Sequence, residues 1–311
     1  MASSSVESSR TARRVPSGVS FFVPDWFTLT VMKPLSGKIA LVGGASRGAG
    51  RGIALALGEA GATVYIAART SRERPAEDLP GTVEDTASEV TARGGAGIPA
   101  VADLSDPQQT AALFQRIEAE QGRLDLLVNS AWSLDCMPVW SERFWDLSPE
   151  LWMQSLASLQ TYWLTSSYAA RIMSRQRSGL ILHVTDNLHD NPSGYRGQVL
   201  WDMSHEALNR LIVGMAADAG KAGFTVAGIN PGFMRTERVL KAMRDEATKK
   251  MFHFDLSESP EYIGRAAAAL AGDPKVAGKN GKLLWVADLA TEYDFTDVDG
   301  RRIPRFNPFG G

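Results

Sequence analysis

The 311-residue chain is poor in cysteine and histidine: Cys136 is its only cysteine, and it has four histidines. A single cysteine excludes an internal disulfide and a multi-cysteine metal site, and it is compatible with a reducing compartment. We therefore expect a cytoplasmic protein without a bound metal ion.

Long runs of one charge and long apolar runs are also absent. The formal net charge is −2, and no block of like charge provides the basic surface that nucleic acid or an anionic membrane would bind. No apolar run reaches the roughly 18 residues of a membrane span. We expect a small-molecule substrate, and neither nucleic acid nor a membrane as a partner.

Residues 1–34 differ from the rest of the chain. They begin with a stretch rich in Ser and Arg, and Pro16 and Pro24 interrupt anything that resembles a signal-peptide core. We interpret them as an N-terminal extension. With 44% hydrophobic residues the chain can bury the core of one large α/β domain, expected at residues 35–290, with a C-terminal tail at 291–311.

Short apolar or β-branched runs alternate with longer segments of helical period. Strands are predicted near 38–43, 63–68, 97–102, 124–129, 179–185, 224–230 and 282–286. Helices are predicted near 49–60, 82–93, 106–121, 149–175, 202–221 and 258–271. This alternation predicts a doubly wound Rossmann fold with a seven-stranded parallel sheet between two layers of helices. The polar, proline-containing segment 70–81 is expected to face solvent.

A glycine-rich turn lies between the first predicted strand and the first predicted helix. Such a turn lets the backbone approach a pyrophosphate, and the helix N-terminus supplies unpaired N–H groups. Gly44, Gly48 and Gly50 have the Gly-x-x-x-Gly-x-Gly spacing, and the turn resembles the cofactor loop of the short-chain dehydrogenase/reductase family. A glycine cluster alone is also typical of a tight structural turn, so the strand and helix around it carry the interpretation.

The second predicted strand ends at Arg69 and has no carboxylate that could accept the ribose hydroxyls of NAD. Arg69, together with Ser46 and Arg47 of the glycine turn, could bind a 2′-phosphate through charge-assisted hydrogen bonds. We therefore expect NADP(H) as the cofactor. The alternative is that both arginines are solvated surface side chains.

The resemblance extends over roughly residues 35–290. It implies that Asp103 contacts the adenine, that the segment beginning at Asn129 matches an Asn-Asn-Ala-Gly motif, and that Thr236 holds the nicotinamide carboxamide. Pro231 and Gly232 match the Pro-Gly segment of the family. The resemblance also implies a substrate lid near 233–257, and a homodimer or homotetramer formed through the helices at 149–175 and 202–221.

The usual catalytic residues of that family are missing. No tyrosine in the chain is followed four residues later by a lysine, and the corresponding positions carry Trp201 and His205. Asp186 most nearly occupies the position of the catalytic serine, and residues 151–173 contain no asparagine. An indole does not ionise in the working pH range, whereas an imidazole can donate a proton near neutrality.

Candidate catalytic residues are therefore Asp186 and His205 as acids, with Tyr195 as a fallback acid. Asp202 is either a second acid or a carboxylate that stabilises a helix N-terminus. Trp201 could line a flat pocket for an aromatic substrate, or pack in the core or an oligomer interface. The other tryptophans considered for such a pocket are Trp132, Trp140, Trp145 and Trp152.

Three functions remain open. The first is an NADP(H)-dependent reductase of a carbonyl or an imine/iminium, with a relocated proton donor. The second is a non-redox cyclase or isomerase of specialised metabolism. The third is a catalytically silent NADP(H)-binding partner. The fold alone cannot choose among them, because function belongs to the site.

Overall fold

The central strands carry apolar side chains on both faces, which a sheet covered on two sides requires. In β1 (Ile39–Gly43), Ala40 and Val42 join one hydrophobic core, whereas Ile39 and Leu41 join the other. Successive side chains of a strand point to opposite faces, so a strand that is apolar throughout contributes to two cores. This explains why the sequence shows unbroken apolar runs rather than alternation.

The computed structural model describes residues 32–76, 78–132, 143–186, 198–251 and 253–306. Its strands are β1, β2 (Thr63–Ala68), β3 (Ala96–Val101), β4 (Leu126–Asn129), β5 (Leu180–Val184), β6 (Thr225–Asn230) and β7 (Leu283–Trp285). They form one seven-stranded parallel sheet in the order β3-β2-β1-β4-β5-β6-β7. The predicted doubly wound fold is confirmed.

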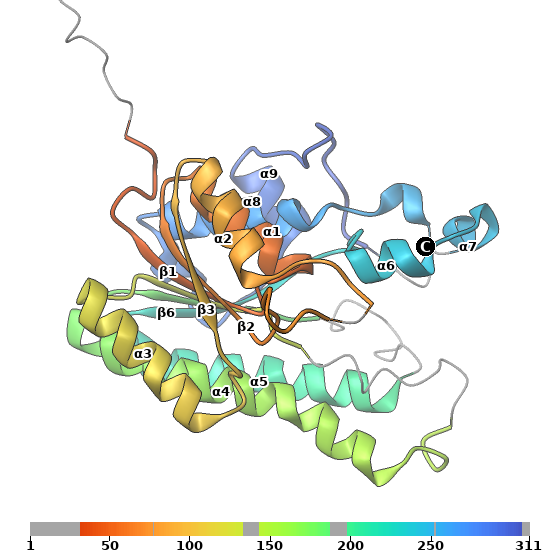
Figure 1. Cartoon of the computed structure of the whole chain (residues 1–311), viewed down its shortest axis with the longest axis horizontal. Coiled ribbons are helices and arrows are strands. Elements are labelled where there is room, and N and C mark those ends of the chain that lie inside the picture. The colour runs from red at the N-terminus through yellow and green to blue at the C-terminus, as the bar shows by residue number, and fades with distance from the viewer. Residues whose placement is uncertain (1–31, 77, 133–142, 187–197, 252, 307–311) are drawn as a thin grey trace, which may run out of the picture. The chain divides into compact units, whose positions relative to one another are not determined.

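Helices cover both faces of this sheet (Figure 1). One layer contains α1 (Gly48–Glu59), α2 (Val83–Ala92), α8 (Pro260–Gly272) and α9 (Val286–Glu292). The opposite layer contains α3 (Pro107–Gln121), α4 (Pro149–Gln176) and α5 (Val199–Ala222). Within the described residues, no helix combines the length and the apolar composition needed to cross a bilayer.

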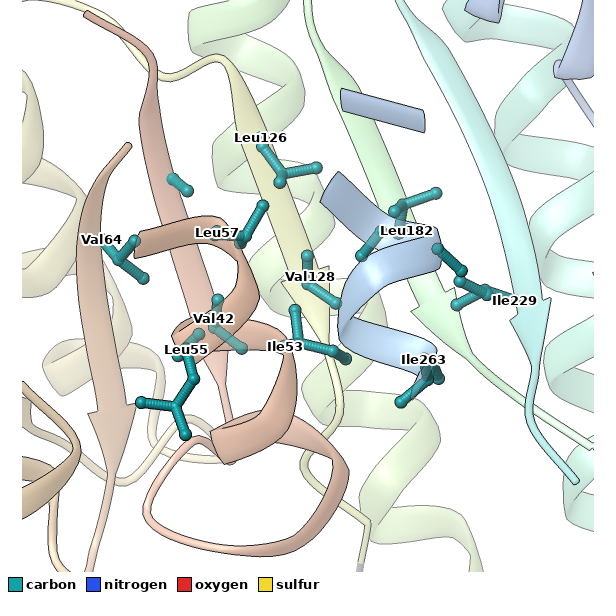
Figure 2. Packing of buried hydrophobic residues seen from close by; sticks show 14 of the residues in the cluster. Val42, Ile53, Leu55, Leu57, Val64, Leu126, Val128, Leu182, Ile229 and Ile263 are labelled. Carbon is teal, nitrogen blue, oxygen red and sulfur yellow. The ribbon is translucent and has the colours of Figure 1, made fainter. Parts of the chain in front are cut away.

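Helices α1 and α8 lie side by side on the sheet and pack their apolar side chains onto β1, β4 and their neighbours (Figure 2). A Cβ atom on Gly52 of α1 would overlap the carbonyl oxygen of Pro260, and one on Gly264 of α8 would overlap the carbonyl oxygen of Gly52. The two backbones are therefore in direct contact, which only glycine permits. This contact sets where α8 begins relative to the glycine turn that precedes α1.

Several short helices were not predicted. α6 (Glu237–Ala242), α7 (Glu246–Met251) and a 3₁₀ turn (Phe254–Leu256) lie within the segment 233–257, and a second 3₁₀ turn (Val276–Lys279) precedes β7. α9 was missed because it starts at the residue after β7, without an intervening loop that would mark it in the sequence.

The expectation that segment 70–81 faces solvent is wrong for part of it. Ser71 and Leu79 are buried, with 3% and 9% of their surface exposed. A Cβ atom on Gly81 would overlap the carbonyl oxygen of Ser46, so this loop packs directly on the glycine turn.

The described residues from Lys33 onward form one unit by their contacts. Within this unit the chain beyond α9 returns to the domain: Ile303 is buried in the same core as α1 and α8, and the Asp297 side chain is fully buried. Asp297 accepts hydrogen bonds from the backbone N–H of Ser259 (2.8 Å) and from Arg235 (3.1 Å). The C-terminal segment thus packs against the N-terminal end of α8.

Candidate active site

The residues expected at the site follow the carboxyl ends of the strands. β1 lies between β2 and β4, so the winding of the chain reverses there, and doubly wound sheets bind ligands in the crevice outside such a switch point. The expected groups are the glycine turn after β1, Arg69 after β2, Asp103 after β3, Asn129 at the end of β4, Asp186 after β5, and Pro231 with Gly232 after β6. The topology therefore brings them to one edge of the sheet.

The glycine turn has a backbone that other residues could not adopt. Gly44 has φ = +77°, and a Cβ atom there would lie 2.7 Å from the backbone of Ala131. Gly48 has φ = +56°, and a Cβ atom on Gly50 would overlap the carbonyl oxygen of Gly44. The turn leads directly into the N-terminus of α1, where the first N–H groups have no acceptor within the helix and favour an anion. This cradle fits the diphosphate of the expected dinucleotide.

A carboxylate from the expected lid contacts this helix terminus. Glu237, the first residue of α6, accepts a hydrogen bond from the backbone N–H of Gly48 at 2.9 Å. Thr236 caps α6 by accepting from the N–H of Val239 at 3.3 Å, and its methyl group lies 3.7 Å from the Cβ position of Gly48. The predicted carboxamide residue Thr236 is thus beside the glycine turn. Glu237 was missed, because its partner lies 189 residues away in the chain.

The three residues expected to bind a 2′-phosphate have different surroundings. Arg69 is exposed at the end of β2. Arg47 donates from Nε to the carbonyl oxygen of Pro80 and from Nη2 to that of Gly81, both at 3.1 Å. Partial burial lowers the pKa of the Arg47 guanidinium, and the nearby carboxylate of Glu237 opposes this shift. Ser46 is buried, at 5% exposure. Arg69 is therefore the more accessible of the two guanidinium groups.

Asp103 and Asn129 are both engaged within the protein. The Oδ1 atom of Asp103 accepts from the backbone N–H (2.9 Å) and the hydroxyl (2.6 Å) of Ser105. The Asn129 side chain accepts from the hydroxyl of Thr165 at 2.9 Å and donates to that of Ser166 at 3.3 Å. Asn129 is 1% exposed, and its amide ties β4 to α4.

An aromatic stack occupies the region of the expected catalytic residues. The His205 ring contacts two indoles, with ring centroids 4.0 Å from Trp132 and 4.3 Å from Trp201, and the two indoles contact each other edge to face at 6.1 Å. Trp132 also contacts Tyr162 edge to face at 5.6 Å, and Tyr162 stacks on His183 at 5.3 Å. Sequence reasoning missed Tyr162 and His183, which carry no motif. Their contact with each other depends on the packing of α4 against β5 in the folded chain.

Asp186 and Trp201 contact each other. The indole Nε1–H of Trp201 donates to Oδ2 of Asp186 at 3.3 Å, and the Asn209 side chain donates to the Asp186 carbonyl oxygen at 3.1 Å. Nδ1 of His205 lies 3.0 Å from the carbonyl oxygen of Trp201. The structure thus brings together three of the predicted catalytic positions.

Burial removes two further ionisable groups from acid–base chemistry near neutral pH. It lowers the pKa of His183 to about 3, so this imidazole is neutral. It raises the pKa of Tyr162 far above its ordinary value, and the Tyr162 hydroxyl donates to the carbonyl oxygen of Val184 at 3.1 Å. A proton donor must therefore come from elsewhere in the site.

The remaining candidates are placed as follows. Asp202 is 6% exposed in the first turn of α5, where its backbone N–H donates to Gln198, so its position agrees with the helix-terminus alternative. Tyr195 and Trp140 lie outside the described residues. Trp145 and Trp152 are 62% and 48% exposed and do not join the stack.

The Pro-Gly segment after β6 has a partner that sequence reasoning also missed. The backbone N–H of Gly232 donates to Oε2 of Glu258 at 3.0 Å. No group of three or more His, Cys, Asp or Glu side chains in the described part of the chain is arranged to hold a metal ion.

A doubly wound parallel sheet with a glycine turn at its switch point is the architecture of a dinucleotide-binding protein. The family model for short chain dehydrogenase matches residues 38–247. Dehydrogenase/reductase SDR family member 1 of Mus musculus is 34% identical over 293 residues, covering 90% of this chain and 89% of the relative. The protein of the same name from Homo sapiens is 32% identical, with coverages of 87% and 86%.

Among solved structures, a short chain dehydrogenase from Mycobacterium thermoresistibile shares the fold, with a TM-score of 0.74 and 21% identity over 89% of this chain and 96% of that chain. The protein belongs to the short chain dehydrogenase family. This is a family of oxidoreductases that bind a nicotinamide dinucleotide.

Proposed function

We propose that the protein is an NADP(H)-dependent reductase in which Asp186, held by Trp201, replaces the hydroxyl groups of the usual family site. The observation that carries this proposal is the hydrogen bond from the Trp201 indole to the Asp186 carboxylate. It fixes a carboxylate directly after β5, at the same edge of the sheet as the glycine turn and the Pro-Gly segment.

The chain has a candidate binding site for the cofactor. The glycine turn would hold the diphosphate, Arg69 with Arg47 and Ser46 would bind a 2′-phosphate, and Thr236 lies near the turn for the nicotinamide half. When bound, the cofactor would supply or accept a hydride. Preference for NADP(H) over NAD(H) rests on the exposed guanidinium of Arg69 and on the lack of a carboxylate at the end of β2.

The substrate is an imine/iminium or a carbonyl. An iminium carbon that receives a hydride becomes an amine without needing a proton, so the Asp186 carboxylate needs only to stabilise the positive charge. A carbonyl also requires a proton on its oxygen, which Asp186 or His205 would donate. The absence of an ionisable hydroxyl at position 201 favours the iminium.

The site also favours a flat, aromatic substrate. Trp132 and Trp201 are half-buried, contact each other edge to face, and both contact His205, so the three rings form one aromatic surface. The Nε1–H of Trp132 is buried and has no hydrogen-bond acceptor among the described residues, so a substrate oxygen or nitrogen could satisfy it.

Titration with NADPH and NADH, followed by quenching of tryptophan fluorescence, tests the cofactor preference. We expect NADPH to bind at least about tenfold more tightly than NADH, and Arg69→Ala to remove this difference. Arg72→Ala is the matched control, because Arg72 is exposed in the same loop after β2 and pairs with Asp85. Equal binding of both dinucleotides by the unaltered protein would contradict the NADP(H) preference.

Turnover with a panel of cyclic imines and aromatic ketones tests the reaction. We expect NADPH oxidation that falls at least about a hundredfold in Asp186→Asn, whereas Trp201→Phe, which releases the carboxylate but keeps an aromatic surface, falls less. Turnover without any change in the cofactor's redox state would favour the non-redox cyclase or isomerase. Binding without turnover would favour the silent partner.

A further inference from the structure

Glu258 is a buried carboxyl group aimed at the turn that follows β6. It is 1% exposed, and its Oε2 accepts the backbone N–H of Gly232 at 3.0 Å. A Cβ atom on Gly232 would lie 3.0 Å from that oxygen, so the approach depends on glycine. The second oxygen, Oε1, is buried and has no hydrogen-bond partner among the described residues. A buried carboxyl oxygen without a partner is costly when ionised.

The backbone of Glu258 is also fastened to the same segment. Its N–H donates to the carbonyl oxygen of Phe233 at 2.8 Å, and its carbonyl oxygen accepts the N–H of Arg235 at 2.8 Å. Three hydrogen bonds, one from the side chain and two from the backbone, therefore join position 258 to residues 232–235. The two backbone bonds hold residue 258 beside the turn, and the carboxyl group adds the third bond.

Burial, and the negative charge of one neighbour, favour the neutral form of Glu258. Asp297 of the C-terminal segment, Arg235 at the start of the expected lid and Tyr262 of α8 are the titratable groups that face it. The positive charge of Arg235 is already paired with the buried Asp297. Burial, together with the negative charge of Asp297, raises the pKa of Glu258 to about 8, although the Gly232 N–H and Arg235 oppose the shift.

We propose that Glu258 is a positioning residue that holds the Pro231–Gly232 turn in its protonated form, and that its ionisation shifts the site's preference from reduced towards oxidised nicotinamide. This inference rests on the proposed function, which places the nicotinamide half of the cofactor beside residues 231–236. The oxidised ring carries a positive charge and the reduced ring carries none. A new negative charge at Glu258 therefore stabilises only the oxidised form.

The test measures Kd for NADP⁺ and NADPH between pH 6.5 and 9. We expect the ratio of Kd for NADP⁺ to Kd for NADPH to fall roughly three- to tenfold across this range in the unaltered protein. In Glu258→Gln, which keeps an oxygen for Gly232 but cannot ionise, the ratio should not change with pH. Glu59→Gln is the matched control, because Glu59 is exposed at the far end of α1, and it should follow the unaltered protein.

A ratio that is independent of pH in the unaltered protein, or one that changes equally in Glu258→Gln, overturns the inference. If neither form of the cofactor binds, the proposed function fails, and the positioning role is then tested on the free protein by hydrogen exchange at the Gly232 amide. Protection of that amide should persist in Glu258→Gln and fall at least about tenfold in Glu258→Ala. Unchanged protection in Glu258→Ala contradicts the positioning role.

Discussion

His183 shows how one buried side chain connects the sheet to the site. It lies on β5 with 0% exposure, its Nδ1 is 3.4 Å from the Asn129 amide, and its ring stacks on Tyr162. Nδ1 accepts from the Asn129 amide, so the neutral ring carries its proton on Nε2, and a second proton on Nδ1 would face that N–H donor instead of an acceptor. Burial accordingly holds the pKa of His183 near 3, and the neutral ring acts as packing for the aromatic stack.

This depressed pKa predicts a loss of stability in mild acid. As the pH falls from 6.5 to 5, the unfolded chain takes up a proton on this histidine and the folded protein does not, so the stability present above pH 6.5 is progressively lost. Over this range we expect His183 to account for about 2 kcal/mol of lost free energy of unfolding. Urea unfolding at both pH values measures it.

His183→Gln should be less stable overall but should lack this part of the pH dependence. His253→Gln is the control, because His253 is exposed in the segment before α8, and it should retain the dependence. Equal slopes for His183→Gln and the unaltered protein would show that His183 is charged or solvated in the folded state.

At the scale of elements, the pair α1 and α8 links the two halves of the expected cofactor site. α1 begins at the glycine turn, and α8 begins two residues after Glu258, which holds the turn after β6. Because the helix backbones touch at Gly52, neither helix can shift without moving the start of the other.

We expect Gly52→Ala to destabilise the protein by about 3 kcal/mol or more, because its methyl group would overlap the Pro260 carbonyl. Gly214→Ala is the matched control. Gly214 lies in the interior of α5 with no atom near its Cβ position, so alanine should stabilise by about 0.5–1 kcal/mol. Thermal or urea unfolding checks both, and an unchanged stability for Gly52→Ala would mean that the helices are further apart.

At the scale of the whole molecule, the order of the strands brings the residues of the site together. Separately, α4 carries exposed apolar side chains. Residues from the ends of six strands meet at one edge only because β1 and β4 are neighbours in the sheet. In the helix layer formed by α3, α4 and α5, Trp163 and Met153 of α4 are 54% and 66% exposed. α4 is one of the two helices through which we expect a homodimer or homotetramer, and α5 is the other.

Trp163→Glu should shift the protein to a smaller assembly, because it places a charge on that surface. Val298→Glu, an equally drastic change at an exposed residue of the C-terminal segment, should leave the assembly unchanged. Light scattering during gel filtration at micromolar concentration measures the mass. An unaltered protein that is monomeric under these conditions would contradict the expectation.

Local sequence signals determined the elements of this fold. Apolar runs and helical periods depend on which residues are adjacent along the chain, so the seven strands and the long helices were predicted, whereas α9 and the short helices of the segment 233–257 carried no clear boundary signal. The glycine turn and the missing tyrosine–lysine pair were also readable, because each is a spacing of a few residues.

Only the tertiary structure decided how the site is assembled. The contact of Glu237 with Gly48 spans 189 residues, and that of Glu258 with Gly232 spans 26. The contacts of His205 with Trp132 and Trp201, and that of Asn129 with Thr165, likewise depend on how α4 and α5 pack against the sheet. Such pairs form because strand order and helix packing bring distant side chains together, and no local spacing along the chain encodes that proximity.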